Sequence, residues 1–305
     1  MLNDFQKEMF KQITNLHDIP QGAVSLRVNG ETKFVSGAKN IRIVKKQNGQ
    51  GFTANIMADT VGKSLHVPVL IDTENINEEI VNDFNIGQNS DVVIVAGCGI
   101  HNDGKKSSSH NATHIFMVGD NCHVKYIERH IGTGKSQKQI SPRTEIFLGK
   151  NSVFEIETTQ LAGVDIAERV TNASLQDGAK LLVKEKLFTA ESQHADSTFV
   201  VMLKGQNSSA EVISRSVAKD TSSQCFLSTL IGINDCFGRV ECDGILLDKA
   251  LVSSAPTIIA KNPDAKLIHE AQIGKIAGEQ LIKLMTLGLT KQEAEQKIID
   301  GFMNL

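Results

Sequence analysis

Three windows in the middle of the chain repeat one pattern: NIGQNSDVVIV (85–95), MVGDNCHVKYI (117–127) and FLGKNSVFEIE (147–157). Each window is a strand end, then a polar turn with Gly, Asn or Asp, then a further strand. Four later windows continue the pattern: LQDGAKLLVKE (175–185), LKGQNSSAEVIS (203–214), IGINDCFGRVEC (231–242) and IAKNPDAKLIHE (259–270). Successive turns are about 26 to 32 residues apart, a period that is typical of solenoids.

The repeat predicts a right-handed parallel β-helix, because two strands and two turns fill one coil of this period. Equivalent positions on neighbouring coils then stack about 4.8 Å apart. A β-sandwich whose strands happen to have similar lengths is the alternative. We predict a β-helix core over 23–270, preceded by an N-terminal helix in 1–22 and followed by a helical segment over 271–305.

Both ends of the chain change to a helical period. Apolar residues at helical spacing predict an amphipathic helix over 2–17 that docks on the body of the protein. After residue 270 we expect two helices, with Gly288 ending the first and a capping box of Thr290 and Glu293 beginning the second. These last helices either cap the solenoid edge or form a docking surface for a partner.

Composition excludes several functional classes. A net charge of −3 and a sequence pI near 6.3 argue against a broad nucleic-acid footprint. With no Trp and one Tyr, the chain lacks stacking platforms for bases or sugars, which also disfavours a β-helix carbohydrate lyase. No apolar run approaches the roughly 18 residues of a membrane span, so we predict no membrane partner. Five scattered cysteines favour a reducing, cytoplasmic location over a disulfide framework.

The segment GTGKS (132–136) resembles the end of a phosphate-binding loop. The full motif needs another Gly where Arg129 stands, and Pro142 follows too soon for the required helix. We therefore interpret the segment as a mobile polar loop and predict that this chain binds no nucleotide.

One constellation could carry chemistry across coils. Aligning the turn residues Asn234 and Asn262 places Cys242 against Glu270, and Glu241 against His269, at an offset of 28 residues. Thiolate, carboxylate and imidazole together suit iron or zinc. The same alignment puts Arg215 near Cys242, where a cation would favour the thiolate. The alternative is a buried, packed Cys242 with Glu270 capping the following helix.

A second cysteine, Cys98, stands between two glycines in AGCGIH. A loop of this kind would expose the thiol and let a partner approach its sulfur, but we favour a buried small residue at this position from the sequence alone. His101, His110 and His114 follow closely and could bind a metal, but no two of them have a fixed ligand spacing.

The C-terminal stretch KLIHEAQIGKIAGEQLIKLMTLGLTKQEAEQKIIDGF (266–302) closely resembles the signature of the SufB/SufD family. It has the His-Glu-Ala, the Lys-Ile pair, the acidic-Gln-Leu, the Gly-Leu turn and the terminal Gly-Phe of that signature. VECDGILLD (240–248) resembles the family's Cys-Asp segment, and AGCGIH resembles a SufB strand end. The resemblance covers roughly residues 85–305.

The resemblance implies a scaffold for iron–sulfur cluster assembly and not an enzyme. Family members pair through their β-helix cores, bind a SufC-type ABC ATPase through the C-terminal helices, and receive sulfur from a cysteine desulfurase. The family's cluster-site Cys and Glu fall on Cys242 and Glu270, with His269 adjacent, and the sulfur-accepting Cys of SufB falls on Cys98. The expected cargo is a transient iron–sulfur cluster.

Two residues depart from the SufB pattern. Ile268 replaces a carboxylate before the His-Glu, and His130 stands where a Gln is expected. Cys242 favours the SufB role, because SufD has a His there. A homodimer could then supply a complete site, or a second SufB/SufD-like subunit could complete it. A SufD-like structural subunit without its own cluster is the alternative.

Overall fold

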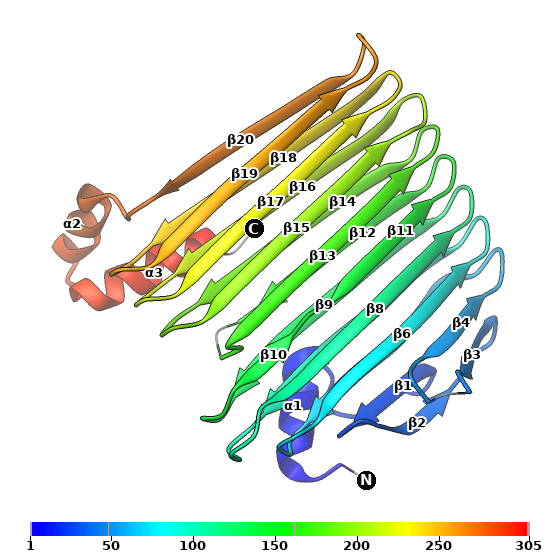
Figure 1. Cartoon of the computed structure of the whole chain (residues 1–305), viewed down its shortest axis with the longest axis horizontal. Helices are drawn as coiled ribbons and strands as arrows, with labels where there is room; N and C mark the ends of the chain where they lie inside the picture. Colours follow the sequence, from blue (N-terminus) through cyan, green and yellow to red (C-terminus); the bar gives the residue numbers. More distant parts are fainter. Residues whose placement is uncertain (1, 48, 162, 304–305) are drawn as a thin grey trace.

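The computed structural model describes residues 2–47, 49–161 and 163–303. Met1 of the predicted N-terminal segment and residues 304–305 of the predicted C-terminal segment therefore lie outside the described residues. The chain forms a parallel β-solenoid of about eight turns, with one helix at the N-terminus and two at the C-terminus (Figure 1). The predicted parallel β-helix is therefore confirmed. The division into three domains remains a prediction.

Each coil contributes one strand to each of two sheets, which face one another across the core. Sheet A contains, in spatial order, β2 (Glu31–Ser36), β1 (Ala23–Val28), β5 (Val61–Ile71), β7 (Asp91–His101), β9 (His123–Thr133), β12 (Val153–Gln160), β14 (Lys180–Thr189), β16 (Ser208–Ala218), β18 (Cys236–Leu246) and β20 (Lys266–Gly274). Sheet B contains β19 (Leu251–Ala260), β17 (Ser223–Gly232), β15 (His194–Leu203), β13 (Ile166–Leu175), β10 (Lys138–Ile140) with β11 (Arg143–Leu148), β8 (Ser108–Val118), β6 (Asn77–Ile86), β4 (Phe52–Ile56) and β3 (Ile41–Lys45).

Alternating burial along the strands creates the core. In β14, for example, every second residue from Leu181 onward is buried while its neighbours are more exposed, as the period of a strand requires. Equivalent inward residues stack from coil to coil, so that the rings of Phe84 and Phe116 lie parallel with their centroids 4.6 Å apart. Such stacked apolar rows hold the coils together.

The repeated turns owe their shape to a left-handed residue. Asn89, Asn121, Asn151, Gly178 and Asn207 all have positive φ, the conformation that Asn and Gly adopt most easily. The amide side chain of Asn121 donates to Asn89, which donates in turn to Asp59. These turns therefore stack with the strands, as predicted for equivalent positions on neighbouring coils.

The first coils of the solenoid are covered. Helix α1 (Asp4–Thr14) begins with a capping box between Asn3 and Gln6 and packs on the outer face of β5, β7 and β9. A Cβ added at Gly99 would lie 2.9 Å from the sulfur of Met9, so the glycine permits this close approach. The antiparallel hairpins β1–β2 and β3–β4 pair with the first strands of the two sheets.

The last coil is covered only in part. Helix α3 (Lys291–Met303) packs through Ile299 on Val217 and Ile245, whereas α2 (Gly278–Thr286) has no buried residue. The predicted capping box is confirmed, because the Thr290 hydroxyl accepts from the Glu293 backbone N–H and the Glu293 carboxylate accepts from the Thr290 backbone N–H. Within the described residues, no helix has the length and apolar character that a membrane crossing requires.

The GTGKS segment ends β9 and forms the following turn, after which the chain enters strand β10. A strand in place of a helix leaves no helix N-terminus to face a phosphate. The side chain of Lys138 folds back onto this turn and donates to the carbonyl groups of Gly134 and Ser136.

Candidate functional site

Cys242 lies in β18 and points into the solenoid, where 1% of its surface is exposed. Burial raises the pKa of its thiol to about 11, with a further contribution from the Glu185 carboxylate and an opposing one from Ser254. The thiol is therefore protonated at neutral pH until a metal or a base takes the proton.

The coil register differs from the predicted alignment by one residue. Cys242 pairs with Ala271, whereas Glu270 pairs with Glu241. A shift of one residue moves a side chain to the other face of a sheet. Cys242 and Glu270 therefore lie on opposite faces, and the predicted stacking of the two is wrong.

The error has a physical cause in the turns. Asn234 and Asn262, used for the alignment, lack the positive φ of the earlier turn residues. The backbone N–H of each earlier turn residue donates to the residue just before the next turn residue, whereas that of Asn207 donates to Asp235, the residue after Asn234. Asn234 therefore does not occupy the equivalent position of its turn. The turn geometry changes while the residue type, Asn, stays the same, so an alignment by residue type does not reveal the change.

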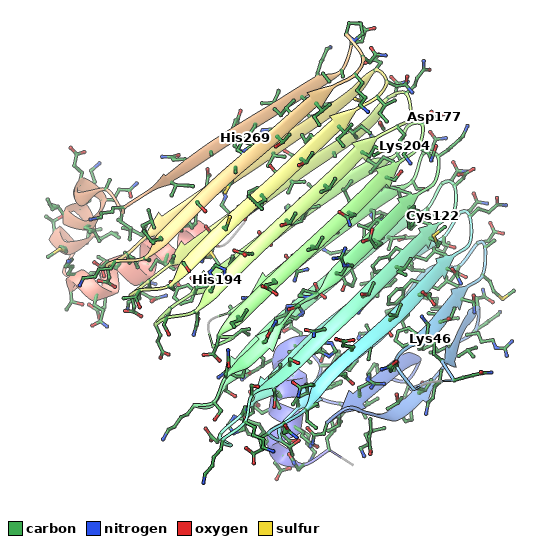
Figure 2. All side chains as sticks on the ribbon, viewed as in Figure 1. Lys46, Cys122, Asp177, His194, Lys204 and His269 are labelled. Atoms are coloured by element: carbon green, nitrogen blue, oxygen red, sulfur yellow. The ribbon has the colours of Figure 1, made fainter. Side chains whose placement is uncertain are left out.

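His269 of β20 shares the inner face with Cys242. It pairs with Val240, two residues before Cys242 along β18. The Nε2 atom of His269 is buried and has no hydrogen-bond partner among the described residues, and burial lowers the pKa of the imidazole. Figure 2 shows His269 on the last strand of the solenoid. The structure thus brings an imidazole and a thiol to one face, two residues apart in register.

Glu270 lies on the outer face, with 55% of its side chain exposed. Its Oε2 accepts from Arg239 at 2.6 Å, and the same guanidinium donates to Glu211 and Glu241. Arg215 also lies on this outer face and pairs with Glu241 and Asp243. Arg215 therefore does not lie beside Cys242 as predicted, because Ser214 is the residue opposite the thiol.

Cys98 lies within β7 and not in an exposed loop. Its side chain is 1% exposed and lies between Val69 and His130 on the neighbouring coils. Burial, together with the carboxylates of Glu78 and Glu128, raises the pKa of this thiol well above its ordinary value. The favoured interpretation of Cys98 as a buried residue is therefore confirmed and its alternative, an exposed thiol, is wrong, since the flanking glycines accommodate α1.

Sequence reasoning missed a row of buried polar side chains inside the solenoid. Near Cys98, the carboxylate of Glu78 accepts from Arg27, and His110 lies 2.7 Å from it. Further along, Glu128 accepts from Arg169 at 2.6 Å and from the hydroxyl of Tyr126 at 2.8 Å. Arginine lowers the pKa of Glu128 well below its usual range despite the opposing effect of burial.

The row continues towards Cys242. Glu185 lies 3.8 Å from Arg169 and accepts from the hydroxyls of Ser197 and Ser214. A cavity of only about 10 Å³ remains beside these residues, so the interior is closely packed. Strand alternation places Glu128, Arg169 and Glu185 at inward positions, which is the sequence signal that could have revealed the row.

The three histidines after Cys98 do not converge. His101 contacts Thr133, His110 contacts Glu78, and His114 contacts Tyr126. In the part of the chain that the structure describes, no three His, Cys, Asp or Glu residues are arranged to hold a metal ion. A site at Cys242 therefore needs either a rearrangement or a ligand from another chain.

Comparison with known proteins identifies the fold's relatives. Residues 81–302 match the model of the SufBD core domain of the SUF system for FeS cluster assembly. An iron–sulfur cluster assembly SufBD family protein of Pyrococcus horikoshii is 30% identical over 88% of this chain and 83% of its own length. A family protein of Archaeoglobus fulgidus is 28% identical over 72% of this chain, which spans 58% of that relative.

A SufBD family protein of Staphylococcus saprophyticus is 26% identical, and the chain spans 55% of its length. The chain thus spans most of the first of these relatives and little more than half of the other two. The match to the core model includes Cys98, Cys242, His269 and Glu270. This chain belongs to the SufB/SufD family of iron–sulfur cluster assembly proteins.

Proposed function

We propose that this chain is a SufB-like scaffold on which an iron–sulfur cluster is assembled. Cys242, His269 and Glu270 are the proposed ligands of the cluster iron, which is cargo and not a resident cofactor. The observation that carries this proposal is the placement of Cys242 and His269 on one inner face of the last coil. Thiolate and imidazole are ligands that iron accepts, and the low number of ligands suits a cluster that is later donated.

The proposed site is completed by a second copy of the chain or by another SufB/SufD-like subunit. β19 and β20 are the end strands of their sheets, so their free edges can pair with a partner strand. Exposed apolar residues line this end, namely Ile258, Ile259 and Ile268. Glu270 stands on the edge strand, from which it could reach iron held at the junction of two chains.

Cys98 is the proposed acceptor of sulfur from a cysteine desulfurase. Its thiolate attacks the outer sulfur of the desulfurase persulfide, the S–S bond there breaks, and the desulfurase thiolate leaves. The raised pKa of Cys98 means that a base must first remove its proton. His130 lies opposite Cys98 on the next coil and is the proposed base, with the Glu128 carboxylate 3.5 Å from its Nε2 atom to orient the ring.

Helix α2 is the proposed contact for a SufC-type ABC ATPase. Its apolar residues remain uncovered in this chain, with Ile282 62% and Met285 44% exposed. A partner that binds ATP would pull on α2 and α3 and so open the last coil. In this proposal the chain itself binds no nucleotide, catalyses no reaction of its own, and works in the cytoplasm.

Anaerobic reconstitution with iron and sulfide tests the scaffold proposal. Cys242→Ser should abolish the visible absorption of the cluster, His269→Ala should weaken it, and Cys225→Ser should leave it intact. Cys225 is a matched control because it is a half-buried thiol on the outer face of β17. Full cluster formation by Cys242→Ser would overturn the assignment.

A SufD-like structural role is the second candidate, and the outward position of Glu270 favours it. In that role the chain would complete a partner's site without holding a cluster. Iron and sulfide analysis of the complex purified without oxygen distinguishes the two. Iron retained by the chain alone supports the scaffold, and iron found only with a second SufB-like subunit supports the structural role.

A further inference from the structure

A network of charged side chains on the outer face of sheet A joins helix α3 to Glu270. Four carboxylates share two guanidinium groups there. Arg239 contacts Glu211, Glu241 and Glu270, and Arg215 contacts Glu241 and Asp243. Glu241 therefore touches both arginines and connects them.

The network begins at the C-terminal helix. The guanidinium carbon of Arg215 lies 5.4 Å from the centre of the Phe302 ring in α3, a distance at which a cation is attracted to an aromatic face. The Nε atom of Arg215 is buried, and no described residue hydrogen-bonds to it. Arg215 is thus held by the ring and by its two carboxylates, and a shift of α3 would release one of these restraints.

The register between β18 and β20 explains the role of Arg239 at the end of the network that contains Glu270. Glu241 and Glu270 lie directly opposite one another on β18 and β20, an arrangement that is unfavourable for like charges. Arg239 donates to both of them at 2.6 Å and so offsets part of their repulsion. A carboxylate engaged in this way is a poorer ligand for iron, because its charge and one oxygen are already used.

We propose that Arg239 is a latch that keeps Glu270 away from iron in the resting chain, and that α3 controls the latch through Phe302, Arg215 and Glu241. This inference rests on the proposed role of Glu270 as a ligand. A partner that displaces α3 frees Arg215, Arg215 and Arg239 then redistribute among the carboxylates, and Glu270 becomes available. Arg239 and Phe302 are accordingly positioning residues.

The contacts of Glu270 can be measured without iron. Carbodiimide labelling of Glu270, followed by peptide mass spectrometry, reports how free its carboxylate is. Arg239→Gln should raise the labelling rate about threefold to fivefold, the range expected for loss of an exposed ion pair. Phe302→Leu keeps an apolar side chain but removes the aromatic face, and should raise the rate about twofold.

Two controls match these variants. Arg143→Gln removes an exposed arginine from sheet B, where Arg143 pairs with Glu145. Phe188→Leu alters another phenylalanine that packs on the same apolar cluster as Ile299. Both should leave the labelling of Glu270 unchanged. Equal rates in Phe302→Leu and Phe188→Leu would overturn the connection to α3, and an unchanged rate in Arg239→Gln would overturn the latch.

Anaerobic equilibrium dialysis with Fe²⁺ tests the consequence. Arg239→Gln should tighten Fe²⁺ binding by about the same factor as it raises labelling, and adding Glu270→Gln should remove that gain. A gain that persists in the double variant would overturn the latch. If Cys242→Ser leaves Fe²⁺ binding intact, the scaffold proposal fails instead, and the labelling rates still decide the connection between Phe302 and Glu270.

Discussion

The two ends of the solenoid are built in opposite ways. At the first coils, α1 and two antiparallel hairpins cover the sheets, and Cys98 lies beneath them. At the last coil, β19 and β20 pair with no further strand of the described chain along their outer edges (Figure 1). Ile258 is exposed there and His269 is partly covered. Cys98 is therefore covered by the helix and hairpins of the first coils, whereas a single coil separates Cys242 from the end of the solenoid.

This contrast has a physical meaning. Free strand edges and uncovered apolar residues are costly in an isolated protein and are normally protected. This chain covers its first coils and leaves the edge strands β19 and β20 of the last coil uncovered. It is therefore suited to association through this last coil, which we call the bare end. The last coil is also where Cys242, His269 and Glu270 lie, so association and the proposed cluster chemistry would occur at one place.

A matched pair of substitutions should show the largest contrast. Ile13→Ala removes a fully buried side chain of α1 and should lower the free energy of unfolding by about 3 kcal/mol. Ile258→Ala at the bare end removes a side chain that is 44% exposed, and should cost about 0.5 kcal/mol in the monomer. Urea unfolding at low protein concentration measures both. Similar losses would remove the distinction between the ends.

Thiol reactivity should sharpen the comparison next. With a pKa of about 11, the Cys242 thiol has about a hundredfold less thiolate near pH 8 than a cysteine at the usual value of 9. Iodoacetamide should therefore modify Cys225 first, then Cys242, and Cys98 last, since Cys98 lies under the covered coils. Mass spectrometry of the labelled peptides gives the order, and labelling of Cys98 before Cys242 would contradict it.

Acid should weaken the closed interior. Burial lowers the pKa of His114 from 6.5 to about 4, so the unfolded chain takes up this proton before the folded chain does. The stabilising contribution is present above about pH 6.5 and is lost as the pH falls towards 4. It amounts to about 2 kcal/mol between pH 7 and pH 5.

His114→Gln should reduce the pH dependence of the free energy of unfolding by this amount, which urea titrations at pH 7 and pH 5 measure through the shift of the midpoint. His66 and His130 also have lowered pKa values and leave a residual dependence in the same direction. A variant whose midpoint falls as steeply as that of the unaltered protein would contradict the assignment to His114.

The smallest effect concerns association at the bare end. Ile258→Lys places a charge on the exposed face of β19 and should weaken self-association about tenfold. Val81→Lys is the matched control, because Val81 is a similarly exposed apolar residue on sheet B far along the solenoid. Sedimentation equilibrium measures both. Equal association of the two variants would place the interface elsewhere.

The repeat itself was predictable because its cause is local. A left-handed turn needs Asn or Gly, and Asn89, Asn121, Asn151, Gly178 and Asn207 supply one in each of five coils. The spacing between these residues equals the register of the strands that follow them. The capping box of α3 was equally readable, since it depends on two residues three positions apart.

The site was harder to predict because its register depends on one residue. At Asn234 the turn changes its geometry without a change of residue type, and the offset from β18 to β20 becomes 29 residues and not 28. That single residue moved Glu270 from the side of Cys242 to the outer face. The covering of Cys98 was hidden for a similar reason, since nothing near AGCGIH shows that α1 lies on the same strand.

The amino-acid sequence alone determined the coil, because its turn residues and alternating strands act over short distances. It also determined the family, through the residues of the last strand and the C-terminal helices. Only the tertiary structure decided which face each functional side chain occupies, which ion pairs hold Glu270, and which end stays bare. Those features arise from contacts between coils and helices that are far apart in the chain, where a shift of one residue reverses the outcome.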